Sequence, residues 1–456
     1  MQEFLGVPLG DVEPITESFL LHQTIDVDLA LQALLAEYGG TRLGISGSHW
    51  AQVDSFEELL ATDFGSFTIG PVQFERKATG PDSDRRVVAV GIGEVLIDGV
   101  PLVWLQRTAL PRYGRDRYTL EVLSPDAPTA DDFLSVVRER MAQLSVLRGQ
   151  VISFVTDQFD YHGAGSELTF LRRPQVRAEE VILPDGTLER VARHVVGIGE
   201  QRAALRAAGQ HLKRGVLLYG PPGTGKTHLV RHLLSRTPGT TAVLLSGSTL
   251  GLLNQATALA RAALPAIVVL EDCDLVAEQR GGGTNAALFE TLEALDGLAP
   301  DADIAFILTT NRVDLLERAL IERPGRVDLA VEIPKPDLES RERLFRLYAA
   351  EMLAVSQLTE AAVHTAADRT EGVTASFTKE LIRRVAINAA QQERPPRDAD
   401  ISDALDEMMS DAESLTRTLL GGEGSALATA SGYEAEVGPG VAPAPYGSRV
   451  TIDFEE

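Results

Sequence analysis

The residues with the clearest chemical potential form a glycine-rich loop that ends in lysine and threonine. In order they are Gly220, Pro221, Pro222, Gly223, Thr224, Gly225, Lys226 and Thr227. Glycines lack a Cβ and so let backbone N–H groups converge on phosphate oxygens. In this pattern the lysine reaches the β- and γ-phosphates of a nucleotide and the threonine hydroxyl holds Mg²⁺. We therefore predict an ATP and Mg²⁺ site here, and we include the next residue, His228, in the nucleotide-binding set.

The elements on either side of this loop are those that a phosphate site requires. An apolar run at 215–219 predicts a strand before the loop, and apolar residues with helical spacing at 229–234 predict a helix after it. The N-terminus of such a helix carries partial positive charge, which favours phosphate. A glycine-rich turn without a ligand is the alternative, and it does not account for the complete pattern in this context.

Two adjacent acids form a second chemical feature. Glu271 and Asp272 follow an apolar run at 267–270, which predicts a buried strand that ends in carboxylates. Beside a phosphate loop, one carboxylate can bind Mg²⁺ through water and the next can polarise the attacking water. Two acids at the end of a strand would be weak evidence alone, but the upstream loop makes them a candidate hydrolytic pair.

At this point the sequence resembles the AAA+ ATPases, as a soluble bacterial member. That family usually has Asp followed by Glu at this position, whereas this chain has Glu271 followed by Asp272. The same swap occurs in the branch that contains the mitochondrial translocase of the Rieske protein. By position, the resemblance implies that Glu271 assists Mg²⁺ and that Asp272 activates water. Because Asp is one methylene shorter than Glu, the opposite division of roles stays open.

The resemblance extends to the next predicted strand and the segment after it. Asn311 directly follows the run 304–310. It corresponds to the sensor residue of the family, which lies between the γ-phosphate and the attacking water. An amide suits this task because it can both donate and accept a hydrogen bond. Segment 312–328 resembles the second region of homology of the AAA subgroup. Arg323 and Arg326 then fall on the two arginine-finger positions, which reach a neighbour's nucleotide and imply a homo-oligomeric, typically hexameric ring. A turn cap for the asparagine and a structural role for the arginines are the alternatives.

Smaller matches place the nucleobase and the central pore. Gly197 and Ile198 lie where AAA chains line the adenine pocket, and Thr374 and Ala375 match the turn of small residues in the lid. The loop 246–253 lacks the aromatic residue that grips a threaded chain in most AAA unfoldases, so either its leucines grip more weakly or no chain is threaded. The resemblance also implies that Arg280 in a second loop faces the pore. The sequence contains no His-Glu-x-x-His zinc-protease motif.

The chain divides into domains by its patterns. Alternating strands and helices over 193–335 predict an α/β domain with a parallel sheet, which is the P-loop AAA+ module. Residues 336–413 have helical patterns only and predict a helical lid. We expect a small α+β domain at 1–165, a linker at 166–192, and an acidic, disordered tail at 414–456.

The N-terminal region carries no chemical motif but has a readable plan. We expect a helix at 26–38, a hairpin that turns at Asp98-Gly99, and a helix at 129–146 capped by Thr129 or Asp131. Its two tryptophans, Trp50 and Trp104, are expected in the core.

Composition limits the function. The net charge of −24 counts against a general nucleic-acid binder, whose affinity rests on Lys and Arg. A single cysteine fits a reducing compartment, no secretory leader or membrane span is apparent, and we expect a cytoplasmic protein.

We therefore predict a chaperone-like, ring-forming ATPase that remodels or disassembles a protein partner bound by its N-terminal domain. A nucleic-acid motor or loader, and a nucleotide-gated scaffold with little turnover, are the alternatives.

Overall fold

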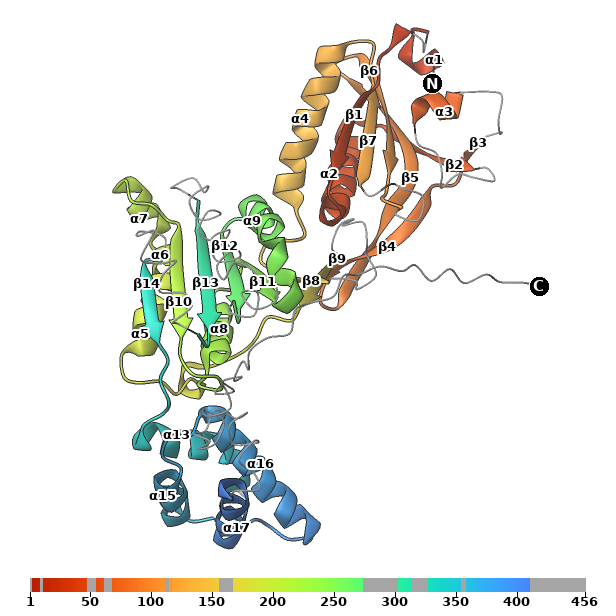
Figure 1. Ribbon diagram of the computed structural model, residues 1–456. Coiled ribbons are helices and arrows are strands. Elements are labelled where there is room, and N and C mark those ends of the chain that lie inside the picture. The colour runs from red at the N-terminus through yellow and green to blue at the C-terminus, as the bar shows by residue number, and fades with distance from the viewer. Residues whose placement is uncertain are drawn as a thin grey trace, which may run out of the picture.

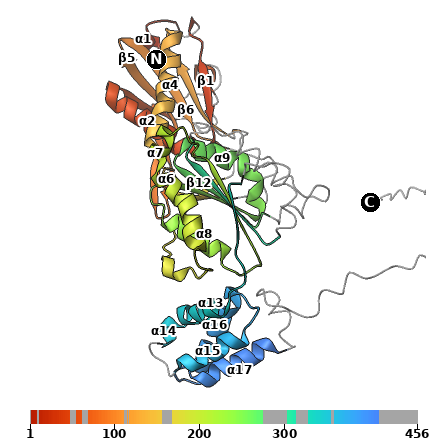
Figure 2. The same cartoon turned by 90° about the vertical axis from the view of Figure 1, so that its left-hand side faces the viewer.

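The computed structural model places the described residues in three domains. In two perpendicular views (Figures 1 and 2) the nucleotide-binding domain lies in the middle, with the N-terminal domain at one end and the helical domain at the other. The structure describes residues 2–8, 11–46, 55–60, 68–110, 115, 117–155, 167–273, 302–312, 327–353 and 358–410. The expected tail at 414–456 lies outside these residues.

A seven-stranded sheet forms the centre of the nucleotide-binding domain. Its strands are β8 (Val151–Val155), β9 (Glu167–Leu171), β10 (Arg214–Tyr219), β11 (Thr241–Ser246), β12 (Ala266–Glu271), β13 (Ile304–Thr310) and β14 (Leu329–Glu332). They are ordered β14-β10-β13-β12-β11-β8-β9, and only β9 runs antiparallel to its neighbour. The α/β fold with a parallel sheet that the apolar runs predicted is confirmed.

Both faces of this sheet are covered, which explains why its central strands are apolar throughout. Alternate residues point to opposite faces, so that Val268 and Phe306 belong to one buried cluster and Ile267 and Ala305 to the other. Helix α9 (Leu253–Ala262) contributes to the first cluster and α8 (Lys226–Ser235) to the second. The segment before β10 adds α5 (Thr187–Ala192), a π-helical turn (Arg193–Gly197), α6 (Ile198–Glu200) and α7 (Arg202–Ala207).

The boundary of this domain differs from the position expected near residue 165. Strand β8 pairs in parallel with β11, with Val151 opposite Ala242, and β9 pairs with β8. Residues that we placed in the N-terminal domain and the linker therefore extend the nucleotide sheet. The physical reason is that β11 would otherwise present an unpaired edge, and a short apolar run does not reveal which sheet it joins.

The N-terminal domain is built on a second seven-stranded sheet, which is antiparallel. Its order is β1-β7-β6-β5-β2-β3, and β4 also pairs with β5. The strands are β1 (Ile15–Phe19), β2 (Thr41–Ser46), β3 (Thr68–Gly70), β4 (Gln73–Gly80), β5 (Ser83–Ile97), β6 (Val100–Arg107) and β7 (Tyr118–Leu123). Short helices α1 (Gln2–Leu5) and α3 (Phe56–Leu60) accompany them.

Two long helices, α2 (Thr24–Tyr38) and α4 (Ala127–Leu144), cover one face of this sheet. The hairpin expected at Asp98-Gly99 is present, and both residues have positive φ, of 49° and 85°, as its tight turn requires. Helix α4 begins earlier than expected, because the Asp126 side chain caps it by accepting from the Thr129 N–H at 3.1 Å. Trp104 is fully buried in the core, whereas Trp50 lies outside the described residues.

The C-terminal domain consists of helices around a core of its own, as expected. Phe345, Phe377 and Leu405 lie in that core. Its helices are α13 (Leu338–Tyr348), α14 (Ala350–Leu353), α15 (Glu360–Arg369), α16 (Ala375–Gln391) and α17 (Asp398–Met409). None of the helices in the described parts of the chain is long and apolar enough to cross a membrane.

Candidate active site

The glycine-rich loop connects the end of β10 to the start of α8. Gly220, Gly223 and Gly225 have φ of 146°, 76° and 106°, values that residues with a Cβ rarely adopt. At Gly220 a Cβ would also lie 2.2 Å from the backbone oxygen of Ile333, so the chain can pass there only as glycine. The spacing of these glycines therefore sets the loop's path, and Lys226 becomes the first residue of α8.

Lys226 is held inside this loop. It is only 6 % exposed, and its Nζ donates to the backbone oxygens of Gly220 and Pro221, both at 2.8 Å. The Thr224 hydroxyl donates to the same Pro221 oxygen at 2.9 Å. The ammonium group thus lies at the N-terminal end of α8, where helix N–H groups already favour an anion.

The two acids lie at the end of β12. Burial, and next the charge of Asp272, raise the pKa of Glu271, while a hydrogen bond with the Thr227 side chain lowers it. Asp272 leaves the strand with φ of 49°, and its N–H donates to the Thr309 hydroxyl at 3.0 Å. The structure therefore brings the Glu271 side chain to that of Thr227, in the first helical turn after the loop.

Asn311 meets the acidic pair from the neighbouring strand. Its Nδ2 donates to Oδ1 of Asp272 at 3.2 Å. This contact arises because β12 and β13 are adjacent and parallel, so their carboxyl ends meet at one edge of the sheet. The described part of the site thus unites residues from three segments that are distant in sequence.

The helical domain touches the phosphate loop directly. The N–H of Ser376 donates to the backbone oxygen of Gly223 at 3.1 Å, and the fully buried Thr374 is the N-cap residue of α16. A Cβ on Gly223 would lie 2.9 Å from the Thr374 hydroxyl. The expected lid residue Thr374 therefore lies against the loop, and Ala375 lies between it and Ser376 in the chain.

The remaining expected nucleotide residues lie around this centre. Gly197 ends the π-helical turn and Ile198 begins α6, both half-buried on the segment before β10. The His228 side chain contacts the segment before α5, where its Nε2 lies 3.0 Å from the backbone oxygen of Glu180. Burial lowers the pKa of His228. Arg323, Arg326 and Arg280 lie outside the described residues.

Sequence reasoning assigned no role to Thr309, although it holds the acidic segment in place. Thr309 is fully buried, and besides the Asp272 contact its backbone oxygen accepts from the Cys273 N–H at 3.0 Å. A threonine on a strand two residues before Asn311 was the available signal. Ser376, which joins the lid to the loop, was not predicted either, although it directly follows the expected lid residues Thr374 and Ala375.

The loop 246–253 also differs from a gripping loop. Its first part forms a 3₁₀ turn (Gly247–Leu252) in which Leu250 is 2 % exposed and packs in the sheet's core, with Leu252 against the same cluster. In this structure the two leucines therefore serve the core of the domain.

Comparison with known proteins agrees with this geometry. Residues 216–335 match the family described as "ATPase family associated with various cellular activities (AAA)", so the chain contains an AAA ATPase domain. It is 35 % identical over 159 residues to 26S protease regulatory subunit 6A of Caenorhabditis elegans, covering 32 % of this chain and 37 % of the relative. It is 29 % identical over 238 residues to the proteasome-activating nucleotidase of Archaeoglobus fulgidus, covering 49 % and 58 %.

A third relative is the ATP-dependent zinc metalloprotease FtsH 3 of Sphaerobacter thermophilus. Identity to it is 29 % over 305 residues, covering 64 % of this chain and 61 % of the relative. The chain thus spans between about a third and about three fifths of the length of these three relatives.

Proposed function

We propose that this chain is a ring-forming ATPase that couples ATP hydrolysis to the remodelling or disassembly of a protein partner. The observation that carries the proposal is the meeting of the phosphate loop, the acidic pair and Asn311 at one edge of a parallel sheet. The AAA domain at residues 216–335 supports the same reaction.

The proposed reaction assigns each of these groups a task. Lys226 exchanges the backbone oxygens of Gly220 and Pro221 for phosphate oxygens when ATP binds, which keeps its positive charge paired. Asp272 accepts the proton of the attacking water as general base. Asn311 already donates to Asp272, so its amide orients the base and can also contact the water.

The donors around Thr227 and Glu271 fit Mg²⁺. A hydroxyl and a half-buried carboxylate that bond to each other offer the hard oxygen ligands that this ion prefers. No group of three or more His, Cys, Asp or Glu side chains that could hold a metal occurs among the described residues. Mg²⁺ at a phosphate site needs none, because substrate phosphates and water complete its shell. The bound ion would supply positive charge opposite the transferring phosphoryl group.

A protein partner and a ring are further parts of the proposal. The names of the relatives tie the nucleotide-dependent domain to proteasomes and to an ATP-dependent protease, which favours a protein rather than a nucleic acid as the object of the work. The ring, with a hexamer as the expected form, rests on the resemblance of Arg323 and Arg326 to arginine fingers. A cytoplasmic location rests on the low cysteine content.

A place near the Rieske-translocase branch rests only on the order of Glu271 and Asp272. The relatives named above are proteasome ATPases and an FtsH protease, which do not support that finer placement. The burial of Leu250 favours remodelling without a tight leucine grip on a threaded chain.

The proposal is tested by replacing the loop lysine and a matched lysine. Lys226→Ala should weaken ATP binding at least about tenfold and stop phosphate release, because a charged hydrogen-bond donor to the phosphates is lost. Lys213→Ala is the control, because Lys213 directly precedes β10 and so lies at the end of that strand opposite the loop. It should retain ATP binding and phosphate release. Isothermal titration and a phosphate-release assay measure the two effects, and unchanged binding in Lys226→Ala would remove the proposed site.

A further inference from the structure

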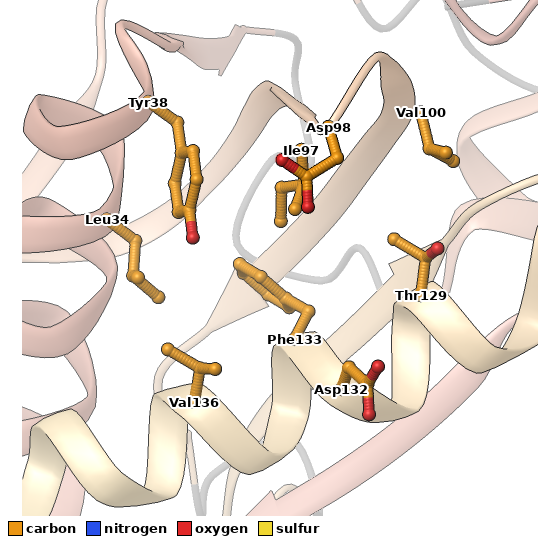
Figure 3. A pocket seen from close by; sticks show the side chains of 9 residues that line it. All are labelled: Leu34, Tyr38, Ile97, Asp98, Val100, Thr129, Asp132, Phe133 and Val136. Atoms are coloured by element: carbon orange, nitrogen blue, oxygen red, sulfur yellow. The ribbon is translucent and has the colours of Figure 1, made fainter.

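The N-terminal domain contains a cavity of about 190 Å³ between α2, α4 and the β5–β6 hairpin. Its walls are mainly apolar, with Leu34 and Phe133 from the two helices and Ile97 from the hairpin (Figure 3). For comparison, an apolar cavity of about 150 Å³ accepts a benzene-sized molecule. The space is therefore large enough for one long side chain.

Two carboxylates also line this cavity. Asp98 stands at the hairpin turn beside the rings of Tyr38 and Phe133, and Asp132 lies on α4 (Figure 3). No lysine or arginine lines the cavity, and within the described residues neither aspartate side chain has a hydrogen-bond or ion-pair partner. Both acids are exposed. The cavity thus combines an apolar interior with unpaired negative charge.

The folding of the domain accounts for the backbone at these positions but not for the charges. An aspartate with positive φ suits the turn at Asp98, yet asparagine or glycine would suit it as well. Asp132 lies beyond the first turn of α4, which contains no acid, so the helix dipole gives it no stabilising role.

We propose that this cavity binds a lysine or arginine side chain from an extended segment of a protein partner. The methylene stem of such a side chain packs on apolar walls, while its charged end stays near the carboxylates and water. This inference rests on the proposed function and on the expectation that the N-terminal domain binds the protein partner.

The position of the cavity supports this use. The first turn of α2 lies at the junction with the nucleotide domain, where Asp26 accepts from the N–H of Val146 at 3.0 Å, just before β8. Tyr38, at the other end of α2, borders the cavity. The cavity therefore lies at the end of α2 remote from the nucleotide sheet, where a partner can dock without covering the phosphate loop.

The test uses the full chain and two labelled peptides. The peptides are fluorescein-Gly-Ala-Ala-Lys-Ala-Ala-amide and the same sequence with norleucine, which keeps the stem but removes the charge. Fluorescence anisotropy should give tighter binding of the lysine peptide. The double variant Asp98→Asn/Asp132→Asn should weaken it about 3- to 30-fold, since two exposed charge pairs are lost, and should leave norleucine binding unchanged.

Asp131→Asn is the matched control, because Asp131 is an exposed neighbour on α4 that does not line the cavity. It should keep the parent's affinity for the lysine peptide. Equal binding of the two peptides, or equal losses in the control and the double variant, would overturn the proposal. The proposal would also be overturned if spermidine bound as tightly as the lysine peptide, because the site would then recognise any small polycation.

The result can be separated from that of the ATPase proposal. Peptide binding is measured also with Lys226→Ala protein, in which the cavity is intact. If the Lys226→Ala protein still binds the peptide, the cavity proposal is supported whatever the outcome for ATP. If no protein binds the peptide, the cavity proposal is wrong, and the hydrolysis assay still tests the ATPase proposal.

Discussion

Asp272 is the residue on which the proposed chemistry depends most. Its left-handed backbone is costly for most residues with a Cβ, but Asp and Asn tolerate it because their short polar side chains can bond locally. The Thr309 hydroxyl and the Asn311 amide hold its N–H and its carboxylate, respectively. Because its backbone N–H and one carboxylate oxygen are both held, Asp272 can present its other carboxylate oxygen to a water molecule.

Asp272→Asn should therefore keep ATP bound and reduce phosphate release by about 10²- to 10⁴-fold, the usual effect of losing a general base. Asn fits the same backbone, so the fold should persist. Asp368→Asn, an exposed aspartate on α15, is the matched control and should release phosphate at the parent's rate.

Glu271→Gln separates the two acids. Its half-buried carboxylate is bonded to Thr227, so loss of this carboxylate should weaken the dependence of ATP binding on Mg²⁺. A titration of Mg²⁺ at fixed ATP measures this. If Glu271→Gln binds Mg²⁺ and ATP normally and only turnover falls, the two acids have exchanged roles.

At the scale of elements, the sequence predicted those strands and helices whose pattern is local. The apolar runs that became β10 to β13 are buried on both faces, and a run of that kind indicates a parallel strand wherever it occurs. The run that became β14 lies at the edge of the sheet, where only Val331 is fully buried. The pair β8–β9 was not placed correctly because pairing partners are a tertiary property. The cap of α4 was misplaced because Asp126, Thr129 and Asp131 are all good cap residues, and only geometry selects Asp126.

The site shows the same division between local pattern and tertiary contact. The phosphate loop was predictable from consecutive residues, and the acids from their place after a strand. The bond between Asn311 and Asp272 follows from strand order, whereas the contact of Ser376 with Gly223 depends on how the lid packs. Such contacts between distant segments are not encoded in any short pattern.

The junction of α2 with α4 provides a pH-dependent prediction. Asp26 is 5 % exposed, and burial raises its pKa to about 6, against the opposing effects of Ser145, Val146 and Arg148. The folded state therefore holds its proton more tightly than the unfolded state does. The parent should lose stability as pH rises from about 4 to about 6, because the buried carboxyl then ionises.

Asp26→Asn removes this ionisation and can still accept from the Val146 N–H. It should stabilise the N-terminal domain by about 3 kcal/mol at pH 7, since the shift is about two pKa units, with the difference vanishing towards pH 4. Both tryptophans precede β8, so urea unfolding followed by tryptophan fluorescence reports on this domain. A constant difference between pH 4 and pH 7 would contradict the assigned cause.

At the scale of the whole molecule, the lid and the N-terminal domain lie at opposite ends of the nucleotide domain (Figure 1). The lid meets the phosphate loop through Ser376 and Gly223, so it can respond to the occupant of the loop. At the other end α4 leads within a few residues into β8, which is part of the same sheet. The nucleotide domain and the N-terminal domain are therefore joined by continuous structure.

The central claim is that each site hydrolyses ATP with the help of a neighbouring subunit. The measurement mixes Arg326→Ala protein, which has an intact phosphate loop, with an excess of Lys226→Ala protein, which has an intact Arg326. Each alone should be almost inactive, since an arginine finger is worth about 10³- to 10⁵-fold in related phosphoryl transfer.

Size-exclusion chromatography with ATP should first establish that the two variants enter the same rings. Phosphate release should then return in the mixture, up to the fraction of interfaces at which a Lys226→Ala subunit donates its arginine to an Arg326→Ala subunit. Mixed rings that form and stay inactive would contradict the claim, because Arg326 would then act within its own subunit or serve only the fold.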